Sequence, residues 1–186
     1  MYEVIWHGRG GQGVVIASQI LAESAYIQGF KGVTSAPTFG PERRGAPLTA
    51  STRISDMPIR TFSQIVKADI AIVLDSSLFD AVDILGSVKP GGLIAINTAQ
   101  KADEVNFQGN LRIATVDAAA IALRFHLIKE GAPIVNTPML GVFAKASGLV
   151  SLEYLEKGLK WKLAGTAAAT NIVALRAAYE ETDMRK

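Results

Sequence analysis

The chain has 186 residues, of which 49% are hydrophobic and 19% are charged, and its net charge is +2 at pH 7. This length fits one sizeable domain, residues 1–186, and the basic residues are spread along the sequence rather than clustered as in nucleic-acid-binding proteins. The absence of cysteine excludes disulfides, thiolate-bound zinc, cysteine-ligated iron–sulfur clusters and a cysteine nucleophile.

The N-terminal segment predicts a strand, a glycine loop and a helix. Residues 2–7 are expected to form the strand and residues 8–13 the loop. Apolar residues then recur at helical spacing over residues 14–28, and Gly29 is a natural end for this helix. A second, short strand is expected at residues 33–36.

A long irregular loop is expected at residues 37–47. This segment contains three prolines and two glycines, which exclude a continuous helix or a central strand. The alternation of apolar and polar residues over 48–55 then predicts a half-buried strand, and residues 59–61 are expected to pair with it in antiparallel fashion.

Three nearly continuous apolar runs in the middle of the chain predict parallel strands buried on both faces. These runs are residues 69–74, 92–97 and 111–116. A helix is expected over residues 77–87, followed by a turn at residues 89–92. Another helix is expected over residues 118–130, with Asp117 as its N-cap and Gly131 at its end.

From Pro138 onward the pattern is helical. The expected helices are residues 139–146, which Gly148 ends, residues 152–163, which Ser151 caps, and residues 166–181. The last helix is apolar almost all round, so we expect it to be covered on every face. The order of elements predicts an α/β fold, a three-layer α/β/α sandwich with a mixed, mostly parallel, Rossmann-like sheet and a helical C-terminal region.

The hydropathy of the chain predicts a cytoplasmic protein that belongs to a larger assembly. No run approaches about 18 consecutive apolar residues, and residues 1–7 lack the basic and apolar regions of a secretion signal. The mean hydropathy of +0.25 is high for a monomer with so little charge, so surplus apolar surface predicts subunit interfaces.

The glycine loop fits the pattern G-x-G-x-x-G between a strand and a helix, where glycines let an anion approach the N–H groups of the first helical turn. The candidate binding residues are Gly8, Gly10, Gly11, Gln12 and Gly13. A dinucleotide site would also need an acidic residue about 20 positions further on, yet residues 29–41 contain none. A loop that binds an anion or a partner backbone, a purely structural turn and a dinucleotide site all stay open.

The irregular loop at residues 37–47, here called the second loop, carries Glu42, Arg43 and Arg44. In a doubly wound sheet it lies with the glycine loop at the carboxyl ends of the strands. Arginine suits bidentate contact with phosphate or carboxylate, whereas a local ion pair of Glu42 with an arginine is the structural alternative. Asn136 and Thr137 are candidate ligand or partner contacts, with the alternative that Thr137 caps a helix whose first residue is Pro138.

The remaining polar candidates are few. His7 ends the first strand beside the glycines, where it could contact a ligand or bond a backbone carbonyl, and His126 is expected in mid-helix as a structural residue. Asp75 follows a buried strand as a general base or, more simply, as a helix N-cap. The order of residues reveals no catalytic triad, no pair of catalytic carboxylates and no metal site.

Three segments in this order and spacing, Trp6–Gly13, Phe39–Pro47 and Asn136–Gly141, make the chain similar to a known family. It resembles the gamma subunit of 2-oxoacid:ferredoxin oxidoreductases, which is equivalent to one domain of the single-chain pyruvate:ferredoxin oxidoreductase. The resemblance covers essentially the whole chain. The form of the segment Arg43–Pro47 looks more like that of pyruvate enzymes than of 2-oxoglutarate enzymes.

The resemblance implies an accessory subunit of a thiamine-dependent enzyme of anaerobic metabolism that is not catalytic alone. In this family a 2-oxoacid such as pyruvate is decarboxylated on thiamine diphosphate, electrons pass through [4Fe-4S] clusters to ferredoxin, and coenzyme A accepts the acyl group. Thiamine diphosphate, its Mg ion and the clusters are expected in alpha, beta and delta partner subunits. The gamma chain is expected to contribute architecture and part of the coenzyme A surface. The alternatives are a stand-alone Rossmann-like nucleotide-binding enzyme and a scaffold without a ligand.

Overall fold

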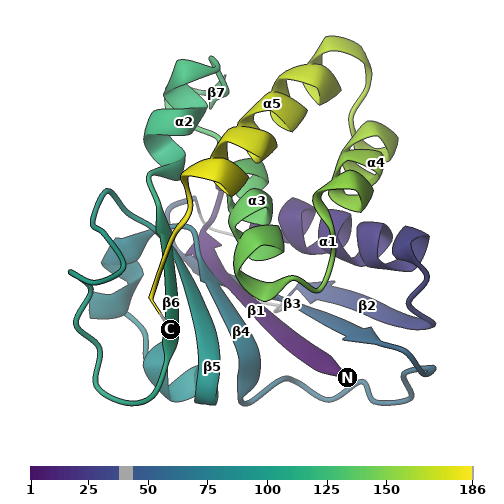
Figure 1. The fold of residues 1–186 in the computed structure, drawn as a ribbon, viewed down its shortest axis with the longest axis vertical. Coiled ribbons are helices and arrows are strands. Elements are labelled where there is room, and N and C mark those ends of the chain that lie inside the picture. The colour runs from purple at the N-terminus through teal and green to yellow at the C-terminus, as the bar shows by residue number, and fades with distance from the viewer. Residues whose placement is uncertain (38–43, 186) are drawn as a thin grey trace.

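The computed structural model describes residues 1–37 and 44–185, and within these residues seven strands form one sheet in the order β2-β3-β1-β4-β5-β6-β9 (Figure 1). The strands are β1 (Tyr2–Arg9), β2 (Gly32–Pro37), β3 (Pro47–Ser55), β4 (Ala68–Val73), β5 (Val88–Asn97), β6 (Arg112–Val116) and β9 (Asp183–Arg185). The neighbours β1, β4, β5 and β6 are parallel. Strand β3 is antiparallel to both β1 and β2, and β9 is antiparallel to β6. Five strands therefore share one direction, which confirms the mixed, mostly parallel sheet.

The α-helices gather on one face of this sheet (Figure 1). They are α1 (Val14–Gln28), α2 (Ala118–Arg124), α3 (Asn136–Ser147), α4 (Leu152–Lys162) and α5 (Gly165–Glu181). Alternate residues of β4 divide between two cores, so that Ile70 and Ile72 pack with the helices while Ala71 and Val73 face the other side. Burial on both faces explains why β4 is an almost continuous apolar run.

The second face of the sheet is covered by a thinner layer than expected. In place of an α-helix over residues 77–87, the chain forms two 3₁₀ helices, η1 (Ser76–Asp80) and η2 (Leu85–Ser87). Aspartate side chains compete for backbone N–H groups here, because Asp75 accepts a hydrogen bond from Ser77 N and Asp83 accepts one from Gly86 N. The residues that pack under β4 and β5 therefore come from short turns and from the segment that follows β5.

The pairing predicted for residues 59–61 is wrong, because these residues form no strand. Strand β3 is hydrogen-bonded along one edge to β1 and along the other edge to β2, which leaves no free edge for a third partner. The turn predicted at residues 89–92 lies inside β5. Gly91 has a positive φ of 76°, and the pairing of β4 with β5 shifts register here.

The helix predicted over residues 118–130 is shorter than expected. Asp117 caps it as predicted, accepting a hydrogen bond from Ala120 N at 2.8 Å, but α2 ends at Arg124. His126 and Glu130 have positive φ values of 56° and 52°, which the interior of an α-helix excludes. The chain turns instead into a small hairpin of β7 (Ile128–Lys129) and β8 (Ala132–Pro133), so His126 is exposed beyond the helix rather than inside it.

The three C-terminal helices are confirmed, and Gly148 ends α3 in the left-handed conformation. Helix α5 is not covered on every face, since Val173 is 47% exposed. The sequence pattern also missed β9, a strand of three residues that joins the edge of the sheet after α5. In the described part of the chain, every helix is too short or too polar to cross a membrane.

Candidate functional site

The glycine loop and the second loop meet at the carboxyl end of β1. Gly10 N donates to Ala46 O at 2.9 Å, and Gly45 N donates to Gly10 O at 3.1 Å. Gly10 and Arg44 also form an isolated parallel bridge. The structure therefore brings together the two loops that sequence reasoning placed at one edge of the sheet.

Arg9 fastens this junction to the end of β4. Its Nε donates to Asp75 Oδ2 at 3.0 Å, its Nη2 to Ser77 Oγ at 2.7 Å and its Nη1 to Gly45 O at 3.1 Å. All three guanidinium nitrogens are thus engaged within the chain. Sequence reasoning did not single out Arg9, because it occupies an unrestricted position of the G-x-G pattern.

Gln12 completes the same network from inside the loop. Its Oε1 accepts from Arg9 N at 2.7 Å, and its Nε2 donates to Asp75 Oδ2 at 3.2 Å. Burial opposes the charge of Asp75, but hydrogen bonds from Ser77 and Gln12 and the charge of Arg9 outweigh this and lower the pKa of Asp75. Asp75 is therefore an ionised cap and anchor, and Gln12 supports the loop rather than facing a ligand.

The amino terminus of α1 is the part of this site that the chain leaves open. Gly13 is the N-cap with a φ of 76° and makes no side-chain capping bond, and the first turn carries no acidic residue. The first helical bond runs from Ala17 N to Gly13 O, so the N–H groups of Val14, Val15 and Ile16 have no acceptor among residues 1–37 and 44–185. Such groups, together with the helix dipole, favour an anion.

Asn136, at the start of α3, supports the glycine loop through a hydrogen bond to its backbone. Asn136 Nδ2 donates to Gly13 O at 3.2 Å, and its Oδ1 accepts from Thr137 N at 2.9 Å. Helix α3 begins at Asn136, so Thr137 is not its cap and Pro138 is not its first residue. Both Asn136 and Thr137 are buried, and Asn136, which bonds Gly13, supports the loop rather than lying at the surface of the chain.

The charged residues of the second loop are only partly described. Glu42 and Arg43 lie outside the described residues. Arg44 Nη1 donates to Glu130 Oε2 at 2.6 Å, which links the second loop to the β7–β8 turn. Both side chains of this pair are largely exposed, so it adds little to stability.

His7 lies on the face of β1 that points away from α1, because its neighbour Trp6 packs in the helical core. It is only 6% exposed, and neither ring nitrogen has a hydrogen-bond partner among the described residues. The backbone carbonyl partner considered for it is therefore not found there. Burial lowers the pKa of His7 to about 4, so its ring is neutral at pH 7.

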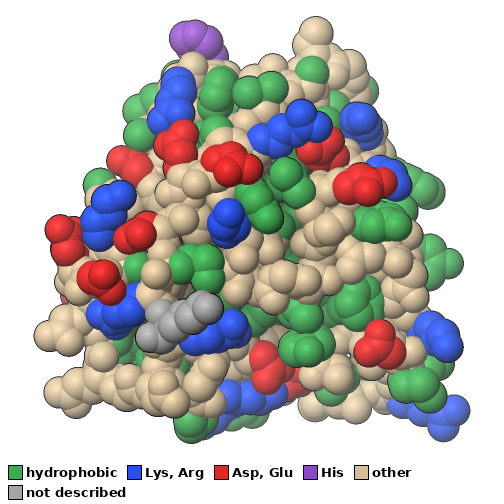
Figure 2. Space-filling model, viewed as in Figure 1, with side chains coloured by type: hydrophobic (Ala, Val, Ile, Leu, Met, Phe, Trp, Pro, Cys, Tyr) green, Lys and Arg blue, Asp and Glu red, His purple; other side chains and the backbone are tan. Residues whose placement is uncertain are grey.

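The helical face of the molecule is of mixed charge. Figure 2 shows acidic and basic side chains interspersed over the helical face, with hydrophobic side chains between them. In the part of the chain that the structure describes, no group of three His, Asp or Glu side chains is placed to hold a metal ion. Within the described residues, the site offers backbone donors and a positive helix end.

Comparisons with known proteins agree over nearly the full length. A family model described as pyruvate ferredoxin/flavodoxin oxidoreductase matches residues 3–181. The pyruvate/ketoisovalerate oxidoreductases common subunit gamma of Pyrococcus furiosus is 46% identical over 187 residues, which cover 99% of this chain and 98% of that protein. The pyruvate synthase subunit PorC of Methanothermobacter thermautotrophicus is 44% identical over 184 residues, covering 98% and 97%. The crystal structure of pyruvate oxidoreductase subunit PORC from Thermotoga maritima superposes with a TM-score of 0.83 at 33% identity, covering 100% of this chain and 98% of that one.

Proposed function

Because this chain belongs to the pyruvate ferredoxin/flavodoxin oxidoreductase family, as a gamma subunit, we propose that it acts only within an assembly whose other subunits carry out decarboxylation and electron transfer. The name of the Pyrococcus furiosus relative describes a subunit common to two oxidoreductases, which supports an accessory role that does not select the substrate. The 2-oxoacid is then pyruvate or a close relative, and the assembly is cytoplasmic. The chain enters it as one domain, residues 1–186.

The residues of this chain do not fit the redox groups of such an assembly. The sequence has no cysteine to ligate an iron–sulfur cluster. We propose that thiamine diphosphate, Mg and the [4Fe-4S] clusters are held by alpha, beta and delta partner subunits, and that ferredoxin takes its electrons from the assembly rather than from this chain.

The role of this chain is to hold an anionic part of coenzyme A at the amino terminus of α1. The observation that carries this proposal is the open first turn, where three N–H groups lack an acceptor among the described residues behind a glycine loop. The network of Arg9, Gln12 and Asp75 fixes the loop in advance, so binding costs little ordering of the backbone. Arg43 and Arg44 are kept as proposed contacts to the phosphates of coenzyme A, because arginine suits bidentate contact with phosphate.

A substitution at Ile16 tests this proposal without disturbing the core. Ile16 is the third residue of α1 and is 45% exposed. A glutamate there is favourable for the helix but repels an anion at its amino terminus, whereas a glutamine has the same size without the charge. In the purified assembly, Ile16→Glu should raise the KM for coenzyme A about fivefold while Ile16→Gln leaves it near the wild-type value. Equal KM values for the two variants would refute the proposal.

A further inference from the structure

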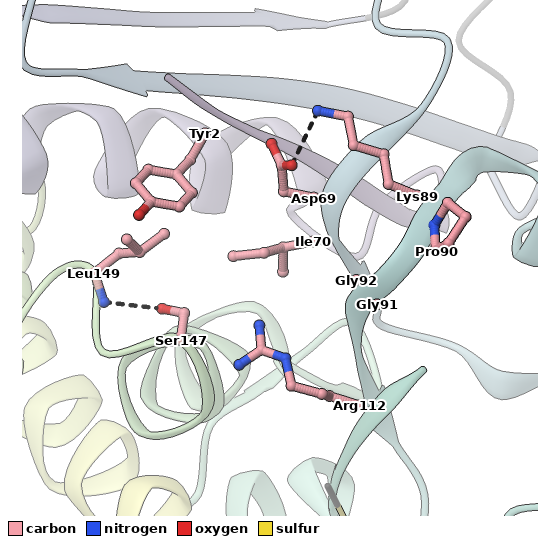
Figure 3. Close-up of a pocket in the computed structure, with 10 residues that line it drawn as sticks. All are labelled: Tyr2, Asp69, Ile70, Lys89, Pro90, Gly91, Gly92, Arg112, Ser147 and Leu149. Atoms are coloured by element: carbon pink, nitrogen blue, oxygen red, sulfur yellow. Dashed lines mark hydrogen bonds and ion pairs between the residues drawn. The ribbon is translucent and has the colours of Figure 1, made fainter. Parts of the chain in front are cut away.

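A cavity lies at the opposite end of the sheet from the glycine loop. It has a volume of about 370 Å³ and lies between the amino ends of four parallel strands and the end of α3 (Figure 3). Tyr2 begins β1, Ile70 is near the start of β4, and Arg112 begins β6. Ser147 and Leu149 close the cavity from the helical side. A volume of this size is in the range of small-molecule sites, about 300–1,000 Å³.

One basic side chain at this cavity, that of Arg112, has no acidic partner among the described residues. Lys89 Nζ contacts Asp69 Oδ1 at 2.9 Å and Glu3 Oε2 at 3.3 Å, and Arg53 Nε contacts Glu3 Oε1 at 3.1 Å. Two basic and two acidic side chains therefore neutralise one another. Arg112 makes no side-chain hydrogen bond or ion pair within residues 1–37 and 44–185, so its charge is the surplus one.

The guanidinium of Arg112 points into the cavity, and apolar groups form much of the rest of its wall. Figure 3 shows Arg112 opposite Ile70, with the ring of Tyr2 and the side chain of Leu149 along the far wall. Ile70 is only 2% exposed and forms an apolar floor. The hydroxyl of Ser147 is already used, since it donates to Phe143 O and accepts from Leu149 N. Among the side chains that line the wall, the guanidinium of Arg112 and the phenol hydroxyl of Tyr2 have no hydrogen-bond partner in the described part of the chain.

We propose that this cavity binds a small organic carboxylate, whose two oxygens meet the planar donors of Arg112 and the hydroxyl of Tyr2. A short apolar body of the ligand then packs against Leu149 and the ring of Tyr2. A single guanidinium with one hydroxyl matches the two oxygens of a carboxylate better than the several acceptors of a phosphate. This site is independent of the coenzyme A proposal, because it lies at the opposite end of the sheet.

A titration of the full-length chain with butyrate, followed by ligand-observed NMR, tests the site. We expect saturable binding with a Kd of about 1 mM, and no saturation with the neutral butyramide. Arg112→Gln should weaken butyrate binding at least about tenfold and Tyr2→Phe about threefold. Arg60→Gln is the matched control, because Arg60 is also exposed but does not line the cavity, and it should bind butyrate like the wild type.

Several outcomes would overturn the proposal. Butyrate that fails to saturate, or that binds Arg112→Gln as well as the wild type, would show that Arg112 anchors no carboxylate. Inorganic phosphate that displaces butyrate at equal concentration would show a general anion site. Binding by the free chain that disappears in the assembled enzyme would show that a partner subunit covers the cavity, so that it is not a ligand site of the enzyme. The unfolding midpoints of all variants should equal that of the wild type. Equal midpoints would exclude unfolding of a variant as the cause of weaker butyrate binding.

Discussion

Asp75 holds the candidate site together, and its replacement by asparagine has a consequence that can be measured. The carboxylate joins the cap of η1 to Arg9 and to Gln12, which lie on a different segment of the chain. The side chains of Arg9 and Asp75 are 30% and 24% exposed, so solvent weakens their attraction only in part. An asparagine keeps the size and one acceptor oxygen but loses the charge and the second acceptor.

The expected cost of Asp75→Asn follows from the bonds that are lost. One ion pair of about 1 kcal/mol and one charge-assisted hydrogen bond of similar worth give about 2 kcal/mol of lost unfolding free energy at pH 7. Urea denaturation of the full-length chain measures this difference. Asp103→Asn is the control, because Asp103 is exposed, and it should change the unfolding free energy by less than about 0.5 kcal/mol.

The pH dependence of the same comparison identifies the charge as the cause. The pKa of Asp75 is lowered in the folded chain from its ordinary value of 3.8, so the unfolded chain binds the proton more readily. The stability that the carboxylate contributes is therefore complete above pH 3.8 and is lost as the pH falls through the lower folded-state pKa. The difference between wild type and Asp75→Asn should shrink in that range. A difference that is absent at pH 7, or that stays constant on acidification, would refute the role assigned to the charge.

Three further substitutions test the burial of His7 and the close contacts of two glycines. Burial lowers the pKa of His7 from 6.5 to about 4, so the wild type should lose about 3 kcal/mol of unfolding free energy as the pH falls from 6.5 to below 4. The His7→Phe variant should lose less over the same range. Urea denaturation of both proteins at each pH measures the difference. Gly13→Ala should lower the free energy of unfolding by about 2 kcal/mol, because Gly13 has a φ of 76° and the new Cβ would lie 2.4 Å from Asn136 Nδ2. An unchanged midpoint of thermal unfolding would contradict this. Gly141→Ala, although it adds a good helix former, should destabilise by more than about 2 kcal/mol, because its Cβ would lie 2.2 Å from Leu175 O; a stabilised variant would show that α3 and α5 can separate.

The strand, glycine loop and first helix could be predicted because local signals fix them. The alternation before the loop, the helical spacing after it and the stop at Gly29 all lie within 30 residues. The partner of residues 48–55 could not be predicted in the same way. Strand β3 inserts between β1 and β2, and this arrangement depends on pairings between segments far apart in sequence.

The candidate site shows the same limit. The G-x-G-x-x-G pattern identifies the glycines, but the residue that fixes their loop, Arg9, stands at a position where the pattern allows any residue. Its partner Asp75 is 66 residues away and was considered as a cap, which the structure confirms, without its ion pair. Asn136 was singled out, but only its burial behind Gly13 reveals that it supports the loop.

The role of this chain as a gamma subunit is tested most directly by the reduction of ferredoxin in a reconstituted assembly. Partner subunits prepared without the chain, the chain alone, and the two combined should be compared with pyruvate and coenzyme A as substrates. Activity that depends on both substrates and appears only in the combined sample is the expected result. Turnover by the chain alone, or full turnover by its partners without it, would contradict the proposal that its function requires the assembly.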